Sequence, residues 1–463
     1  MNKSKVVINK AFYLGDLKKD SLFLRAMGLI YNDSVVYGLD SCGKCYYKQD
    51  NKIEIQDIDI EKDYMKVSAN FSQPEFIDTS FKEINLKKSI LMYVQEQEIW
   101  IEPVYHIDLF MLPFQVRVLE TDILVYPIIK TYENNSIIIS YSIYIGDRMD
   151  TENFKKIFAD FNRNLFEKMT MPVYYAPKHK EEDEVVVLVD DENCKYIEVG
   201  TQNYEFRNII SFSWYLLNYI YKLDQPVTFY GRCSYFIESS ERDQINKQFI
   251  DTLLKGVNGN YKYELKNDSL NRDYKKFFNE RASIVVGKDA ENIESEIQAI
   301  EERMMLQVIN LGRIVENLKN DKYSYNELKK IYNKTVYDYI EHRDSHYGEV
   351  EYTLQKMHAF MKSKEKIEFL KMGLEEKIKE KDSYYQEKTA LFALLLSAGP
   401  ICDYMLFPMI NDILHMEKIY NFIKMVKGIQ IGFLIREVYL KGICFIIAIG
   451  LIYFLYKVFI RKK

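Results

Sequence analysis

The chain has 463 residues, of which 28% are charged and 48% hydrophobic, and its net charge is -5. This length allows two or three domains with separate cores. There is no basic excess, so no nucleic-acid partner is expected, because such partners usually require a basic face. Six cysteines in a chain of this length do not form a disulfide framework.

The distribution of proline divides the chain into two parts. Seven of the nine prolines lie between Pro74 and Pro226, and the next is Pro400. Because proline breaks helix interiors, this gap predicts a mixed first part and a helical second part. We expect a cytosolic α/β or α+β domain over residues 1–240 and a helical stalk over 241–388.

The first domain begins with residues that exclude a signal peptide and continues with alternating strands and helices. The opening stretch, MNKSKVVINKAFYLGD, has no apolar core, so we expect the bulk of the chain to remain in the cytosol. A helix is expected from a cap at Asp150 or Thr151 to about Met169, and another over 208–222. Glu133 to Asn135 join two strands as a hairpin. The expected strands are SVVYGL, ILMYVQEQEIWIEPV, ILVYPIIKTY, SIIISYSIYIG and VVVLV.

The second part has helical periodicity throughout. Apolar residues step by four and three from 293 to 318, which predicts coiled-coil-like heptads and favours either self-association or an intramolecular bundle. Ser324 and Glu327 form a capping box that starts a second helix. A third segment, 349–397, lacks proline and would be about 70 Å long if it were one continuous helix. The heptad residues are Ile293, Ile297, Ile300, Met304, Leu311, Ile314 and Leu318.

Two apolar segments follow the stalk, one within a membrane-proximal region at 389–441 and one within 442–463. Residues 442–460 are apolar except for Lys457 and precede the basic 461–463, which predicts a transmembrane helix about 28 Å long. Residues 389–411 hold one charge, Asp403, and a break at Gly399 and Pro400. This segment is either a first membrane pass, with Asp403 facing an interior or a pore, or a helical hairpin outside the hydrocarbon with Asp403 in water. The cationic, amphipathic link 411–441 slightly favours a single pass.

Two polar groups are candidate binding sites. His342 and His346 lie one helical turn apart and could chelate a divalent cation, although a solvated helix end has the same composition. Strand alternation places Glu102, His106 and Asp108 on one face, where they could contact a small-molecule ligand or be isolated structural residues.

Enzyme signatures are missing from the sequence. The one CxxC, Cys42 and Cys45, has no second pair of ligands nearby, so a turn with two free thiols is favoured over a metal site. There is no phosphate-binding loop, dinucleotide fingerprint or nucleophile elbow. We therefore do not expect an enzyme, and no catalytic residue or cofactor other than a candidate divalent cation is assigned.

The order of the parts resembles the CorA-type divalent-cation transport superfamily. The shared features are an amino-terminal α/β domain, a long helix running into an apolar segment, and a last apolar helix with a basic tail, LIYFLYKVFIRKK. The GMN tripeptide of that family is absent, since residues 397–403 read SAGPICD, and the link of about 30 residues replaces a short loop. The resemblance therefore transfers no site residue.

Together these features predict a homo-oligomer in the inner or plasma membrane. Its cytosolic domain would bind or sense a ligand and act through the stalk on the bilayer, as a distant CorA-like channel or a membrane effector in bacterial defence or stress. One alternative is a single-pass scaffold that recruits protein partners, and another is an anchored enzyme. If ions pass, Asp403 is the expected pore residue.

Overall fold

The structure is a computed structural model in which two compact units can be described separately. The first comprises Met1–Tyr323 with Lys329–Leu370, and the second Ser324–Leu328 with Lys371–Lys463. The described residues are 4–13, 35–40, 44–49, 52–57, 65–71, 82–84, 105–133, 135–145, 149–159, 161, 164–172, 182–189, 196–204, 206–221, 228–238, 247–256, 274–288, 290, 294–319, 323–341, 362–413, 438–455 and isolated residues between these ranges.

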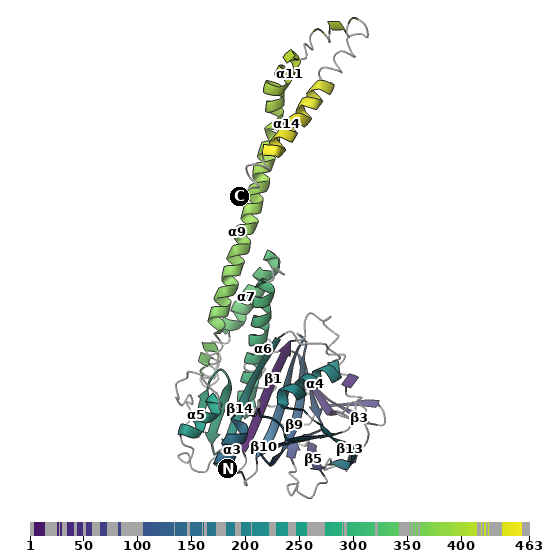
Figure 1. The fold of residues 1–463 in the computed structure, drawn as a ribbon, viewed down its shortest axis with the longest axis vertical. Coiled ribbons are helices and arrows are strands. Elements are labelled where there is room, and N and C mark those ends of the chain that lie inside the picture. Colours follow the sequence, from purple (N-terminus) through teal and green to yellow (C-terminus); the bar gives the residue numbers. More distant parts are fainter. Residues whose placement is uncertain are drawn as a thin grey trace. The chain divides into compact units, whose positions relative to one another are not determined.

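The first unit contains a mixed β-sheet and several helices (Figure 1). Its strands are β1 (Ser4–Tyr13), β2 (Val35–Asp40), β3 (Lys44–Gln49), β4 (Lys52–Asp57), β5 (Met65–Phe71), β6 (Lys82–Ile84), β7 (His106–Met111), β8 (Phe114–Val118), β9 (Thr121–Tyr132), β10 (Ser136–Ile145), β11 (Lys168–Pro172), β12 (Glu182–Val189), β13 (Tyr196–Tyr204), β14 (Thr228–Glu238), β15 (Tyr274–Phe278) and β16 (Ala282–Gly287). The helices of the chain are α3 (Thr151–Phe158), α4 (Ile209–Tyr221), α5 (Lys247–Lys255), α6 (Glu294–Lys319), α7 (Tyr325–Glu341), α9 (Ser363–Leu396), α10 (Ala398–Ile401), the π-helix η3 (Cys402–Leu406), α11 (Phe407–Ile413) and α14 (Lys441–Leu455).

The sheet is mostly antiparallel and places β1 near its centre. The strand order is β15-β16-β14-β1-β10-β9-β8-β11-β13-β12-β5-β6, and only β14 and β16 form a parallel pair among the described pairings. A branch leaves β9 through β7 and continues to β2, β3 and β4. The sequence-based expectation of a mixed α and β domain is therefore confirmed in its α+β form.

The branch arises because β9 pairs with two strands in succession along one edge. Its first half pairs with β8 up to Val125, and its second half pairs with β7 from Ile128. Pro127 lies between these two stretches. Proline has no N–H to donate to a ladder, so it suits the point where one neighbour ends and the next begins.

Helices cover both faces of the sheet (Figure 1). On one face, α3, α4 and α5 pack on the even-numbered residues of β1, such as Val6 and Ile8, and form the largest core. On the other face, α6 packs on Val7 and Ala11. Because successive strand residues point to opposite faces, β1 serves two cores with alternate side chains.

Short-range sequence signals predicted several elements well. The hairpin of β9 and β10 is present, with Asn135 N–H donating to Tyr132 O at 3.2 Å. Helix α3 begins behind Asp150, whose carboxylate accepts from Asn153 N at 2.7 Å. The capping box is also present, since Ser324 Oγ donates to Glu327 Oε2 at 2.7 Å.

The predicted continuation of α3 to Met169 is wrong. The helix ends at Phe158, and Met169 lies in β11. Glu167 N donates to Arg117 O at 2.8 Å, which draws the chain into the sheet between β8 and β13. Tertiary hydrogen bonding therefore overrides a helical spacing of apolar residues.

The helical region also differs from the prediction in two respects. Strands β15 and β16 lie within 241–388, where only helices were expected. The first heptad residues of α6, Ile297, Ile300 and Met304, pack on the sheet, while Leu311 and Ile314 pack with Leu370 of α9. The stripe thus serves intramolecular packing, and a coiled coil between chains remains a prediction.

The long third helix begins later than predicted. Helix α9 starts at Ser363, directly after Lys362, whose φ is 53°. A non-glycine residue in this region interrupts a right-handed helix. The predicted continuous helix from 349 is therefore wrong, although the helical run does extend from Ser363 to Ile413.

The turn between β8 and β9 provides a test of backbone strain. Leu119 and Glu120 both have positive φ, 48° and 61°, as in the two-residue turns that favour Asn-Gly. The double substitution Leu119→Asn with Glu120→Gly should raise the free energy of unfolding by about 1 kcal/mol and the melting temperature by roughly 2 °C. Thermal denaturation of the purified full chain, followed by circular dichroism, measures this.

Glu133→Gly is the control for that experiment. Glu133 is also a turn residue between strands, but its φ is not positive. Glycine there should lower stability slightly, because it only adds freedom to the unfolded chain. Equal effects at the two turns would contradict the strain at Leu119 and Glu120.

Candidate functional site

The second unit contains an apolar pair of helices that is the main candidate site. The run Ser363–Ile413 has 51 residues and, by length and composition, is long and apolar enough to cross a membrane. Its apolar part, together with the shorter apolar helix over Val438–Phe454, is here named the apolar hairpin (389–413 and 438–455). The two helices lie side by side (Figure 1).

Small side chains recur in the contact between the two helices, alternating with larger apolar ones. Cys402 Sγ lies 3.6 Å from Lys441 O, and Lys441 Nζ lies 5.2 Å from the Phe407 ring, so the start of α14 meets the region just after α10. Small residues four apart let helix backbones approach closely, as is common in membranes. The buried residues of this contact are Ala398, Cys402, Leu440, Cys444, Ala448 and Ile452.

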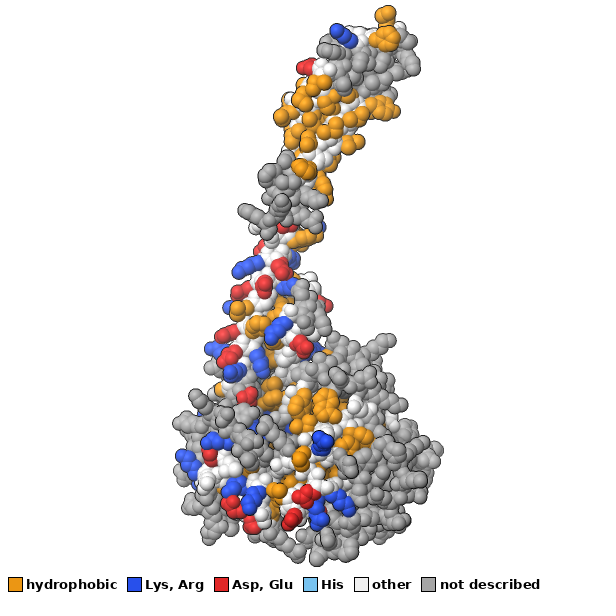
Figure 2. Space-filling view, in the orientation of Figure 1, with side chains coloured by type: hydrophobic (Ala, Val, Ile, Leu, Met, Phe, Trp, Pro, Cys, Tyr) orange, Lys and Arg blue, Asp and Glu red, His pale blue; other side chains and the backbone are white. Residues whose placement is uncertain are grey.

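The outer surface of the apolar hairpin is also apolar. Only 11% of the most apolar window of its first helix is buried. Figure 2 shows hydrophobic side chains gathered over the region of α11 and α14. Soluble proteins rarely expose so many large apolar side chains on neighbouring helices. The exposed members include Phe392, Leu396, Tyr404, Met405, Met409, Ile443, Phe445, Ile446, Leu451, Tyr453 and Phe454.

Asp403 lies exposed within this surface, on a π-helical turn. Helix η3 begins two residues after Pro400, and Phe407 N donates to Cys402 O, five residues back. Pro400 cannot donate to the carbonyl four residues earlier, which favours a local change in helical winding. Turns of this kind are frequent at functional sites. The predicted break at Gly399 and Pro400 is thus a change of winding within a continuing helix.

The polar set predicted in the first domain is partly visible. His106 and Asp108 share one face of β7, with Nε2 and Oδ1 3.7 Å apart, and both are buried. Lys130 Nζ lies 3.5 Å from Asp108 Oδ2 and 2.8 Å from Glu302 Oε2 of α6. The set therefore belongs to the contact between the sheet and α6, which sequence reasoning did not foresee.

The remaining predicted ligands cannot be placed. Glu102, His342, His346 and Cys42 lie outside the described residues, while Cys45 lies in β3. Among the residues that are described, no group of three or more His, Cys, Asp or Glu could hold a metal ion.

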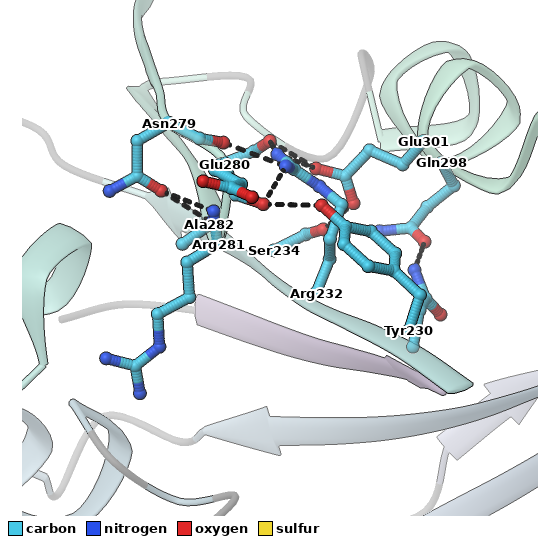
Figure 3. A network of polar contacts seen from close by, with 11 residues as sticks. Tyr230, Arg232, Ser234, Asn279, Glu280, Arg281, Ala282, Gln298 and Glu301 are labelled. Atoms are coloured by element: carbon cyan, nitrogen blue, oxygen red, sulfur yellow. Dashed lines mark hydrogen bonds and ion pairs between the residues drawn. The ribbon is translucent and has the colours of Figure 1, made fainter. Parts of the chain in front are cut away.

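The contact between α6 and the sheet is strongly ionic (Figure 3). Arg232 of β14 is fully buried and pairs with Glu301, with Nη2 and Oε1 3.4 Å apart. Its Nη1 donates to Asn279 O and Glu280 O at 2.8 and 2.7 Å. Burial disfavours the charge on Arg232, but Glu301 and Tyr230 together outweigh burial and hold the pKa of the guanidinium above its usual value.

Further pairs repeat this pattern along α6. Lys5 pairs with Glu294, and Asn9 Nδ2 donates to Gln298 Oε1 at 2.9 Å. Burial opposes the charge on Lys5, yet the carboxylate of Glu294 raises the pKa of that amine. The acidic and amide residues of α6 recur every three or four positions, which is the sequence signal for a polar helix face against a cationic sheet. Buried pairs of this kind position a helix on a sheet.

Comparison of the chain with protein-family models, curated proteins and solved structures finds no match. The geometry of the chain itself must therefore carry any functional argument.

The Arg232–Glu301 pair yields a stability prediction. Arg232→Met leaves Glu301 buried without its cation and should cost about 3–5 kcal/mol, as should Glu301→Leu. The double variant should recover most of that loss, because neither charge remains. Urea unfolding of the purified full chain, followed by circular dichroism, measures the free energy of unfolding of each variant. The four values give the coupling free energy between Arg232 and Glu301.

Lys155→Met is the matched control. Lys155 pairs with Glu152 at 2.7 Å, but the Glu152 side chain is mostly exposed. Removing this pair should change the free energy of unfolding by no more than about 0.5 kcal/mol. A cost for Arg232→Met as small as this one would mean that the buried pair does not hold α6 on the sheet.

Proposed function

We propose that this protein is a membrane-attached homo-oligomer in which the apolar hairpin of each copy crosses the bilayer twice. The oligomer conducts ions along a path lined by Asp403. The observation that carries the proposal is the hairpin itself, whose outer surface is apolar and exposed while small residues recur in its inner contact. In lipid, such a surface needs no protein cover, and helices satisfy their own backbone hydrogen bonds. The same order of parts supports a distant relation to CorA-type transporters.

The position of Asp403 supports the conducting role. A carboxylate at membrane depth costs several kcal/mol unless it faces protein or water. Asp403 is exposed on the single hairpin. Two helices do not enclose a channel, so several copies arranged around one axis would shelter Asp403 and place it in the ion path.

In this proposal, residues 1–388 lie in the cytosol, and basic residues flank both sides of the two crossings. With two crossings, α9 and residues 461–463 lie on the same side of the bilayer. Cytosolic flanks of membrane helices carry an excess of Lys and Arg. On the proposed cytosolic side are Lys377, Lys379, Lys381, Lys388, Arg461, Lys462 and Lys463, and on the other side are Lys418, Lys424, Lys427, Arg436 and Lys441.

The two-crossing topology predicts a labelling pattern. A cysteine appended after Lys463, in a background with Cys402→Ala and Cys444→Ala, should resist an impermeant maleimide in intact cells and react after lysis. Gly428→Cys in the same background is the matched control and should react in intact cells. The protein should stay in the membrane pellet after carbonate extraction. Outside labelling of the appended cysteine would indicate one crossing and favour a scaffold.

Ion flux tests the conducting role. Liposomes containing the purified full chain should pass K⁺ or Mg²⁺, recorded with an entrapped ion-sensitive dye. Asp403→Asn should lower that flux at least about tenfold, because a carboxylate in a narrow path attracts cations. Asp412→Asn, a neutralised carboxylate near the end of the same helical run, should retain most of it.

The possible results separate the alternatives. Absence of flux from the wild-type protein, after correct insertion has been verified, would overturn the conducting role. Equal flux from Asp403→Asn and wild type would leave a pore but remove Asp403 from the path.

A further inference from the structure

The first unit contains a buried lysine, Lys10, whose surroundings differ from those of Lys5, Lys130 and Arg232. Lys10 lies in β1 and is 2% exposed. As an even-numbered residue of β1, it lies on the face covered by α3, α4 and α5, opposite the ionic contact with α6. Its amine is therefore on the apolar side of the sheet.

The neighbouring strand makes room for this amine. Lys10 is paired with Gly231 of β14, and a Cβ at Gly231 would lie 2.8 Å from Lys10 Nζ. The ring of Phe229, which is 41% exposed, lies 5.6 Å from the same nitrogen. The amine thus lies over a glycine and beside a ring that is partly exposed.

Lys10 has no carboxylate partner among the described residues, and none of them accepts a hydrogen bond from it. Lys5, Lys130 and Arg232, which are also buried, each pair with a carboxylate. Burying an ammonium group without an acceptor is strongly unfavourable.

A second cation lies close to Lys10. The backbone oxygen of Arg281 accepts from Cys233 N at 3.1 Å, two residues along β14 from Gly231. Its guanidinium donates to Lys255 O at 2.9 Å and Ala159 O at 3.3 Å, and Figure 3 shows this side chain pointing away from Arg232 and Glu301. Burial, followed by the charge of Arg281, lowers the pKa of Lys10 to about 7, although the nearby Cys233 thiol acts in the opposite direction.

We propose that Lys10, beside Arg281, forms a binding site for a small oxyanion such as sulfate, phosphate or a carboxylate, entered past Phe229. The anion would supply the acceptor that the Lys10 amine does not have in the chain. The guanidinium of Arg281 would add a second positive charge, held in place by the carbonyls at the ends of α3 and α5. This site is independent of the proposed ion conduction.

Sulfate is the probe, because its charge does not change near neutral pH. Wild-type full chain in detergent should bind sulfate by isothermal titration calorimetry, against sodium chloride at equal ionic strength. Lys10→Met should weaken sulfate binding at least about tenfold, since it removes a charge-assisted hydrogen bond. Lys247→Met, an exposed lysine of α5, is the matched control and should bind like wild type.

The pH dependence provides a second readout. Because the pKa of Lys10 is about 7, its amine is largely protonated at pH 6 and largely neutral at pH 8.5. Wild-type sulfate affinity should therefore be several-fold higher at pH 6. The sulfate affinity of Lys10→Met should lack this pH dependence, and any change that remains should come from titratable groups other than Lys10.

The thermal stability of Lys10→Met provides a third readout, which does not depend on a measured sulfate affinity. The folded pKa lies below the unfolded value of 10.5, so the folded protein without anion is disfavoured most at or below about pH 7 and gains stability as the pH rises to 10.5. Lys10→Met should therefore melt higher than wild type at pH 6 without sulfate, and sulfate should narrow that difference. Failure of wild type to bind sulfate beyond chloride, or equal binding by Lys10→Met, would overturn the site.

Discussion

Three buried positive charges on one face of the sheet have negative partners, and α6 supplies all three. Lys5, Lys130 and Arg232 come from three different strands, yet each pairs with a carboxylate of the same helix. An unpaired buried charge is far more costly than a paired one, so these contacts restrict how α6 can lie on β1 and β14. The apolar residues of α6 then fill the remaining space, and its later turns pack with α9. The first unit thus depends on charge pairing as much as on hydrophobic burial.

The apolar hairpin follows a different physical rule. Its inner contact combines small residues with leucine and isoleucine, and its outer surface has no protein cover among the described residues. In water this surface would drive aggregation, whereas in hydrocarbon it is the stable arrangement. Asp403 is a charged residue within that surface, and Asp412 lies near the end of the same helical run. This contrast between a charge-paired first unit and an apolar hairpin is the basis of the proposal that the hairpin lies in the membrane.

Signals within a few residues predicted local elements of the structure. They could not predict pairings between residues that are far apart in the sequence. The β9–β10 hairpin, the Asp150 cap and the Ser324 capping box each involve residues a few positions apart, so spacing alone could predict them. The strand at Met169 could not be predicted, because its hydrogen-bond partners lie on β8 and β13. Of the candidate site, Asp403 was predicted from its isolation in an apolar run. The partner of Lys5 is 289 positions away, and no periodicity in β1 indicates it.

The central place of β1 has a consequence for the order of folding during synthesis. Strand β1 is synthesised before its two neighbours, β10 and β14, whose residues follow more than a hundred and more than two hundred positions later. A translating ribosome adds roughly 5–20 residues per second, so β1 waits on the order of ten seconds or more for both neighbours. Nonlocal pairing of this kind also slows folding of the complete chain. The polar residues Lys5 and Asn9 on one side of β1 keep this waiting strand from being uniformly apolar.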